Sequence, residues 1–111
     1  MILSSIRMAI PHAKRGEVLK ILRSLAEQIR DDVGCLGCHI YEDINEKNML
    51  MFEEVWRADE DLNYHIRSEK YRNLLLVLEM ADKRPEIRFN TVSQITGIET
   101  IEKIRNPINT S

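Results

Sequence analysis

Five consecutive residues, Cys35-Leu36-Gly37-Cys38-His39, have the types and spacing to do chemistry. The pattern C-x-x-C-H is the attachment signature of a covalently bound c-type haem. Two thiols and an imidazole could also contribute to a zinc site, and the two thiols alone could form a redox dithiol. Each of these sites makes demands on the surrounding sequence, which can therefore be used to choose among them.

The surroundings of this motif favour a structural role. A c-type haem is normally attached outside the cytosol, but the N-terminal stretch MILSSIRMAIPH alternates in polarity and does not form a secretory signal. A redox dithiol would lie at a helix N-terminus, whereas this motif follows a predicted helix and precedes a predicted strand. Zinc would need a further ligand, from His12 or His65. We expect a glycine-built turn with Cys35 and Leu36 buried, two free thiols, no bound metal and a cytoplasmic location.

A second group of candidates lies farther along the chain. Glu54 and Trp56 are two residues apart in a predicted strand, so they share one face of it. Trp56 could anchor the core or stack on a planar ligand, and Glu54 could pair with a base, accept a proton or orient His65. His65 falls on the following helix, and its titration range suits proton transfer near neutral pH. A structural role and a catalytic role both remain open for these three residues.

Three other side chains are candidates for binding a ligand. The ring of Tyr71 is expected to pack in the core, with its hydroxyl facing a pocket. Arg72 could bind an oxyanion or be a solvated surface residue. His39 faces opposite to Cys38 in the predicted strand, and we ask whether it points into the pocket and joins His65 there.

The composition bounds the class of protein. The chain has 111 residues, of which 43% are hydrophobic and 31% charged, which fits one globular domain. The net charge of -2 gives no attraction to nucleic acid or to anionic membrane. The longest apolar run is too short to span a bilayer. We expect neither nucleic acid nor membrane as a partner.

The hydrophobic pattern predicts the elements that position these residues. Alternation with a period of two residues predicts four strands, at residues 2–10, 38–43, 49–57 and 86–96. Helical periodicity and capping residues predict a helix over 14–32, a second from Asp59 and a third from Ser68. The order β-α-β-β-α-β predicts a ferredoxin-like α+β fold, with a four-stranded antiparallel sheet and helices on one face. Residues 1–96 form this domain, and 97–111 are expected to be an extension with a short helix or a docked tail.

The other face of the predicted sheet has no covering element. It carries apolar residues on whichever parity the helices leave over, namely Cys38 and Ile40, or Met49, Met51 and Val55. Such a surface predicts a partner, and a homodimer through the open sheet face is the simplest one.

Two stretches, VGCLGCHIYED and MFEEVWRADEDLNYHIRSEKYRNLL, resemble a known family. They match the antibiotic biosynthesis monooxygenase family of dimeric α+β barrels, and the order of elements extends the resemblance to about residues 2–96. The matching positions are Gly34-Cys35-Leu36-Gly37, Glu54-x-Trp56, His65, Ser68 and Tyr71.

The resemblance implies a small-molecule pocket between sheet and helices. Some members of the family oxidise quinol-like or polyketide aromatics with oxygen and without a cofactor, so the resemblance also implies this activity. Relatives of that kind use a tryptophan at the position matching Trp56, and some have an asparagine where this chain has Phe52, so that polar contact is missing here. Other relatives isomerise small phosphorylated compounds or have no known activity, so the reaction has to be argued from the site.

We therefore expect a cofactor-independent monooxygenase, with neither metal nor flavin, that acts on a small aromatic ligand. His65 or Glu54 would remove a phenolic proton, and Trp56 and Tyr71 would hold the ring in a dry pocket. One alternative is an isomerase or lyase of a small carbonyl compound that uses the same histidine and glutamate. Another is a dimer that only binds a small ligand. An apolar aromatic pocket would favour a quinol, and a basic pocket a phosphorylated carbonyl compound.

Overall fold

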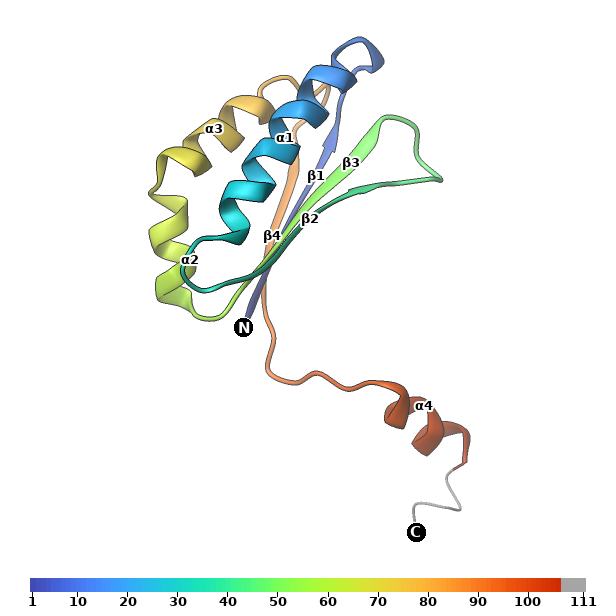
Figure 1. The fold of residues 1–111 in the computed structure, drawn as a ribbon. Coiled ribbons are helices and arrows are strands. Elements are labelled where there is room, and N and C mark those ends of the chain that lie inside the picture. The colour runs from blue at the N-terminus through green and yellow to red at the C-terminus, as the bar shows by residue number, and fades with distance from the viewer. Residues whose placement is uncertain (107–111) are drawn as a thin grey trace.

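The structure, a computed structural model, describes residues 1–106 and confirms the predicted ferredoxin-like α+β fold. Figure 1 shows one sheet with helices packed along one side of it. The strands are β1 (Ile2–Ala9), β2 (Cys35–Glu42), β3 (Met49–Trp56) and β4 (Glu86–Thr91). The helices are α1 (Arg15–Arg30), α2 (Asp59–Ile66), α3 (Glu69–Leu78) and α4 (Ile98–Arg105), and a short 3-10 helix η1 (His12–Lys14) precedes α1. The sheet order is β2-β3-β1-β4, and all three neighbouring pairs are antiparallel.

The alternation in the two central strands decides which side chains form the core. Every second residue of β1 and of β3 is buried, because one face of each strand lies under the helices. The apolar stripe of α1 packs on this face and buries Val18, Leu22, Leu25, Ala26 and Ile29. Glu54 and Trp56 both fall on the buried parity of β3, so a carboxylate and an indole lie side by side beneath the helices.

The fourth strand is shorter than the alternation suggests. β4 ends at Thr91, which pairs with Ile2, and the N–H of Val92 then donates to the carbonyl of Met1. No strand within the described residues pairs with 93–96, so the extended pattern there does not become a strand. The helix-side residues Ile87 and Phe89 remain 42% and 47% exposed, because the helices cover the other three strands and leave this edge open.

The start of α3 follows the predicted cap. The Ser68 hydroxyl accepts from the Tyr71 N–H at 3.3 Å and donates to the His65 carbonyl at 2.6 Å. On this helix Leu75 is 45% exposed, whereas Leu74 and Val77 are buried. Successive residues turn by about 100° around a helix. Leu75 therefore lies about 40° beyond Tyr71, the edge of the buried stripe.

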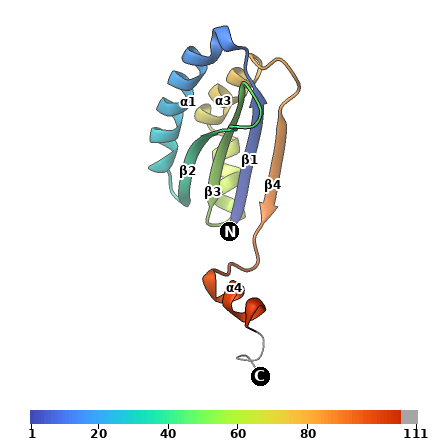
Figure 2. The ribbon, with the colours of Figure 1, turned by 90° about the vertical axis from the view of Figure 1, so that its right-hand side faces the viewer.

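Two alternative groups of apolar residues were predicted for the open face of the sheet, and the structure has the second group there. Met49, Met51 and Val55 point away from the helices, together with Leu3 of β1, which pairs with Val55. Cys38 is absent from this face, because it pairs with Glu54 on the helix side. Figure 2 shows the sheet with the helices behind it and its other face uncovered.

The last described element extends beyond the sheet. In Figures 1 and 2, α4 lies past the end of β4 and away from the other helices. Its three isoleucines, Ile98, Ile101 and Ile104, are 69%, 58% and 71% exposed. Residues 107–111 of the predicted extension lie outside the described part. Among residues 1–106, no helix combines the length and the apolar character that crossing a membrane would require.

Candidate functional site

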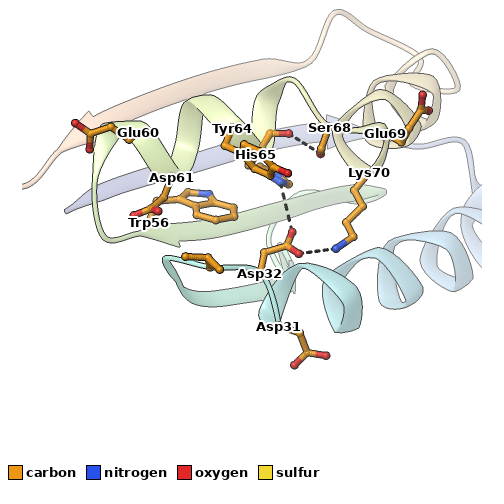
Figure 3. Close-up of a pocket in the computed structure, with 11 residues that line it drawn as sticks. Asp31, Asp32, Trp56, Glu60, Asp61, Tyr64, His65, Ser68, Glu69 and Lys70 are labelled. Atoms are coloured by element: carbon orange, nitrogen blue, oxygen red, sulfur yellow. Dashed lines mark hydrogen bonds and ion pairs between the residues drawn. The ribbon is translucent and has the colours of Figure 1, made fainter.

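A pocket of about 720 Å³ lies between the turn that follows α1 and the helices α2 and α3. Trp56 and His65 form its floor and are almost fully buried, whereas Val33 and Tyr64 on its rim are each 79% exposed. Figure 3 shows the indole beneath α2 and the imidazole projecting from that helix toward the turn. The volume suits a small aromatic molecule.

A buried carboxylate holds the imidazole from behind. The Glu54 Oε2 atom lies 2.7 Å from the His65 Nε2 atom, and each side chain exposes only 1% of its surface. Its other oxygen, Oε1, accepts a longer bond of 3.4 Å from the Trp56 indole N–H. Because a carboxylate only accepts, the Nε2 atom of His65 carries a proton. Glu54 is therefore not a wall of the pocket but a group that fixes the orientation and the tautomer of His65.

The second imidazole nitrogen points toward Asp32 on the other wall of the pocket. Nδ1 of His65 is buried and has no hydrogen-bond partner among the described residues. The Oδ2 atom of Asp32 lies 4.0 Å from it, beyond hydrogen-bond range. The Oδ1 atom of the same carboxylate lies 2.5 Å from the Lys70 ammonium at the start of α3. Figure 3 shows Asp32 between His65 and Lys70.

A glycine allows the turn and α2 to come this close. Gly34 has a φ of 82°, a conformation that side chains disfavour, and its carbonyl accepts from the Arg57 N–H at 2.8 Å. A Cβ at Gly34 would overlap the side chain of Asp61 in the first turn of α2. The glycine therefore positions Asp32 on one wall of the pocket and His65 on the other.

Aromatic rings pack on both sides of the imidazole. The ring centroids of Trp56 and His65 are 4.5 Å apart, and Tyr71 meets His65 edge-on at 5.2 Å. Burial, together with the nearby charge of Glu54, raises the pKa of the Tyr71 hydroxyl. Tyr71 is not among the residues that line the pocket, so it supports the imidazole from within the core instead of facing a ligand.

Two predicted ligand-binding residues lie elsewhere. His39 pairs with Glu53 on the open face of the sheet, opposite to Cys38, and so cannot join His65. The reason is the alternation of β2, which turns neighbouring residues to opposite faces. The Arg72 side chain is 74% exposed and lies 4.0 Å from Glu69, so it is a surface residue of α3 and not an anion-binding group of the pocket.

The CLGCH motif has a structural place at the start of β2. Cys38 is fully buried and Cys35 partly so, both as free thiols, and burial raises the pKa of each. Leu36 is 59% exposed, contrary to the prediction, because a bulge between Cys35 and Gly37 turns it outward. Cys38 and His39 point to opposite faces of the sheet, so they cannot bind one metal ion together. Residues 1–106 contain no cluster of three or more histidine, cysteine or acidic side chains arranged to hold a metal.

Among the pocket residues that the sequence did not indicate, three bear on its chemistry. Asp32, Tyr64 and Lys70 all line it. Tyr64 immediately precedes His65, so a search of the helix residues next to the histidine could have found it. Asp32 and Lys70 are 38 residues apart in the chain, and no local pattern connects them.

The charge of the pocket lining is mostly negative. One lysine, Lys70, and five acidic residues line the pocket; the acidic residues are Asp31, Asp32, Glu60, Asp61 and Glu69. Only some of these charges are paired, as Asp32 is with Lys70 and Asp61 is with Arg57 at 3.3 Å. The lining therefore disfavours an anionic ligand and accepts a neutral one that can donate hydrogen bonds.

Comparison with known proteins agrees with the resemblance. The model of the antibiotic biosynthesis monooxygenase family matches residues 1–75. An uncharacterized protein of Synechocystis sp. is 30% identical over 74 residues, which are 67% of this chain and 46% of that protein. The chain thus spans about half the length of this relative.

Solved structures share the fold. A conserved protein from Methanosarcina mazei superposes with a TM-score of 0.75 at 26% identity, over 80% of this chain and 89% of that one. A candidate antibiotic biosynthesis monooxygenase from Deinococcus radiodurans gives a TM-score of 0.81 at 16% identity, over 88% and 98% of the two chains. At 16% identity the second likeness speaks for the fold alone.

Proposed function

The chain belongs to the antibiotic biosynthesis monooxygenase family, and from this premise we propose that it oxidises a small phenolic or quinol-like aromatic without a cofactor. One observation carries the proposal. A buried carboxylate fixes one nitrogen of His65, while the other nitrogen, unpartnered, faces a pocket whose floor is an indole. A proton acceptor beside an aromatic surface is what the oxidation of a phenol requires.

The reaction balances without an added reductant. A phenol that gains one oxygen atom and loses two hydrogens becomes a quinone, and the second atom of O₂ leaves as water. The substrate supplies all four electrons that O₂ takes up. In this scheme the Nδ1 atom of His65 accepts the hydroxyl proton, and the electron-rich phenolate then reacts with oxygen at a ring carbon.

The surroundings of His65 stabilise the charges that form. When Nδ1 takes a proton the ring becomes an imidazolium, and the Glu54 carboxylate at 2.7 Å compensates that charge. The phenolate lies next to the same imidazolium, so the new charges form a close pair. Glu54 takes no part in the proton transfer itself, which revises the expectation that either residue could remove the proton.

The charge of the pocket argues against the first alternative. An isomerase of a phosphorylated carbonyl compound needs cations for the phosphate, but the lining offers one ammonium, already bound to Asp32, against five carboxylates. A binding protein without activity remains the competing function, and only an activity measurement separates it from an oxygenase.

Oxygen consumption with chemically reduced 1,2-naphthoquinone tests the proposal. We expect uptake above the autoxidation background, and a loss of at least about a hundredfold in kcat for His65→Ala. His12→Ala, an exposed histidine of η1, is the matched control and should keep full activity. Uptake at the background rate, with His65→Ala indistinguishable from the unmodified protein, would exclude the oxygenase.

We also propose that the protein acts as a homodimer through its open sheet face. Leu3, Met49, Met51 and Val55 are apolar residues on this face, interspersed with Ser5, Arg7 and Glu53, and no described element covers them. α4 supports a second contact, because an isolated helix of eight residues is marginal in water and this one exposes three isoleucines. Residues 97–106 of the extension would then reach the partner. The two free thiols suit the reducing cytoplasm, which we propose as its location.

A further inference from the structure

We propose that the pocket recognises an aromatic ligand with two hydroxyl groups on neighbouring ring carbons, one bound by His65 and the other by Asp32. This inference rests on the function proposed above, because it concerns the same pocket, and it names the class of substrate. The family resemblance does not include Asp32.

Both groups that face the gap are hydrogen-bond acceptors. A carboxylate accepts only, and Nδ1 of a neutral imidazole accepts because Glu54 holds the proton at Nε2. Nδ1 is buried and unpartnered, so the site lacks a donor at this atom. A ligand that fits must bring two donors, which a carbonyl or phosphoryl group cannot do.

The spacing of the two acceptors selects the pattern of hydroxyls. Nδ1 of His65 and Oδ2 of Asp32 are 4.0 Å apart. Hydroxyl donors lie about 2.7 Å from their acceptors, and oxygens on adjacent ring carbons are themselves separated by about one hydrogen-bond length. Two such oxygens can therefore each face one acceptor across this gap. Hydroxyls at opposite ends of a ring cannot, because only one of them reaches the gap.

The position of Asp32 is fixed independently of the ligand. Its Oδ1 atom is held by Lys70, whose ammonium also lies 3.5 Å from the Gln28 carbonyl at the end of α1. The other oxygen of this carboxylate, Oδ2, points toward His65, as Figure 3 shows. An acceptor that is already held in place loses little entropy when the ligand binds.

Anaerobic calorimetry with three matched ligands tests the inference, since without oxygen no turnover occurs. The ligands are 2,3-dihydroxynaphthalene, 2-naphthol and 2,3-dimethoxynaphthalene. We expect the dihydroxy compound to bind about tenfold more tightly than 2-naphthol and the dimethoxy compound to bind most weakly. Asp32→Asn should reduce the affinity for the dihydroxy compound to that for 2-naphthol. Asp82→Asn, an exposed site after α3, should change nothing.

A measurement on the unmodified protein removes any dependence on how the variants fold. In ¹⁵N spectra we expect the proton of His65 at Nε2, and a shift of its Nδ1 resonance when the dihydroxy compound binds. Equal affinities for the three ligands, no binding of the dihydroxy compound, or an unmoved Nδ1 resonance would each overturn the inference. Selective binding without oxygen uptake would uphold it while rejecting the oxygenase. Oxygen uptake without selective binding would support the oxygenase and overturn the inference about the two hydroxyl groups.

Discussion

The carboxylate of Glu54 and the imidazole of His65 meet at 2.7 Å, and only 1% of either side chain is exposed. The two residues come from β3 and α2 and lie 11 positions apart in the chain. A carboxylate so deeply buried is stable only when donors satisfy it, and here the imidazole and the Trp56 indole both donate to it. The same pair therefore contributes to the stability of the core and fixes the orientation of the His65 imidazole in the pocket.

Glu54→Gln tests whether this pair positions the imidazole for proton transfer. The amide keeps the shape of the side chain but has no charge to compensate an imidazolium, so we expect kcat for oxygen uptake to fall between about tenfold and a hundredfold. KM should change by less than about threefold, because Glu54 does not line the pocket. Glu27→Gln, exposed on α1, is the control of the same chemistry. A kcat that stays unchanged in Glu54→Gln would mean that the pair is purely structural.

The turn at Gly34 is the second feature that the structure makes testable. We expect Gly34→Ala to lower the free energy of unfolding by about 2–4 kcal/mol, because alanine disfavours a positive φ and its methyl group would overlap Asp61. Gly16→Ala is the matched control. Gly16 lies in α1 with open space around it, so alanine there should raise stability by roughly 0.5–1 kcal/mol. Thermal denaturation measures both, and equal effects of the two substitutions would refute the argument.

The fold could be predicted because its signals are local. The alternation of residues 2–10 and 49–57 marks both central strands, and Ser68 marks the start of α3 as its cap. The errors occur where a neighbour decides the outcome. The strand pattern of residues 93–96 has no strand among the described residues to pair with, and Leu36 turns outward at a bulge that no residue type indicates.

The site was predictable only in part, for the same physical reason. Glu54 and Trp56 were placed together correctly, because two residues on one strand share a face. The contribution of Asp32 depends on a turn, on α2 and on Lys70 of α3, and these meet only in three dimensions. The side of the sheet on which His39 lies could not be predicted, because the parity of β2 relative to the helices follows from its pairing with β3.

The buried thiol of Cys38 predicts a specific dependence of stability on pH. In the unfolded chain this thiol ionises near its ordinary value of 9.0, whereas burial raises its pKa in the folded protein. Unfolding above pH 9.0 therefore releases a proton, and rising pH favours the unfolded state. Below that pH the contribution of the thiol is fully present. From pH 9.0 upward, we expect the stability advantage of the unmodified protein over Cys38→Ala to shrink by at most about 1.4 kcal/mol per pH unit.

Urea unfolding curves between pH 7 and pH 11 measure this difference. Cys35→Ala is the control, because Cys35 is only partly buried and should show a smaller change. The same burial predicts that Cys38 resists alkylation in the folded protein at neutral pH and reacts only after unfolding. A difference between the unmodified protein and Cys38→Ala that stays constant across the pH range would contradict the burial of this thiol.

The open sheet face gives the last prediction. Met51 lies on it between Tyr41 of β2 and Arg7 of β1, where no described element covers it. A lysine at this position would place a charge in a dimer interface and beside Arg7, but it would leave the core under the helices untouched. We expect light scattering at micromolar concentration to give twice the mass of one chain for the unmodified protein and for Leu75→Lys, whose site is exposed on α3. Met51→Lys should give the mass of one chain with unchanged circular dichroism. A dimer that survives Met51→Lys would place the interface elsewhere, and a monomeric unmodified protein would mean that no second copy covers the open sheet face.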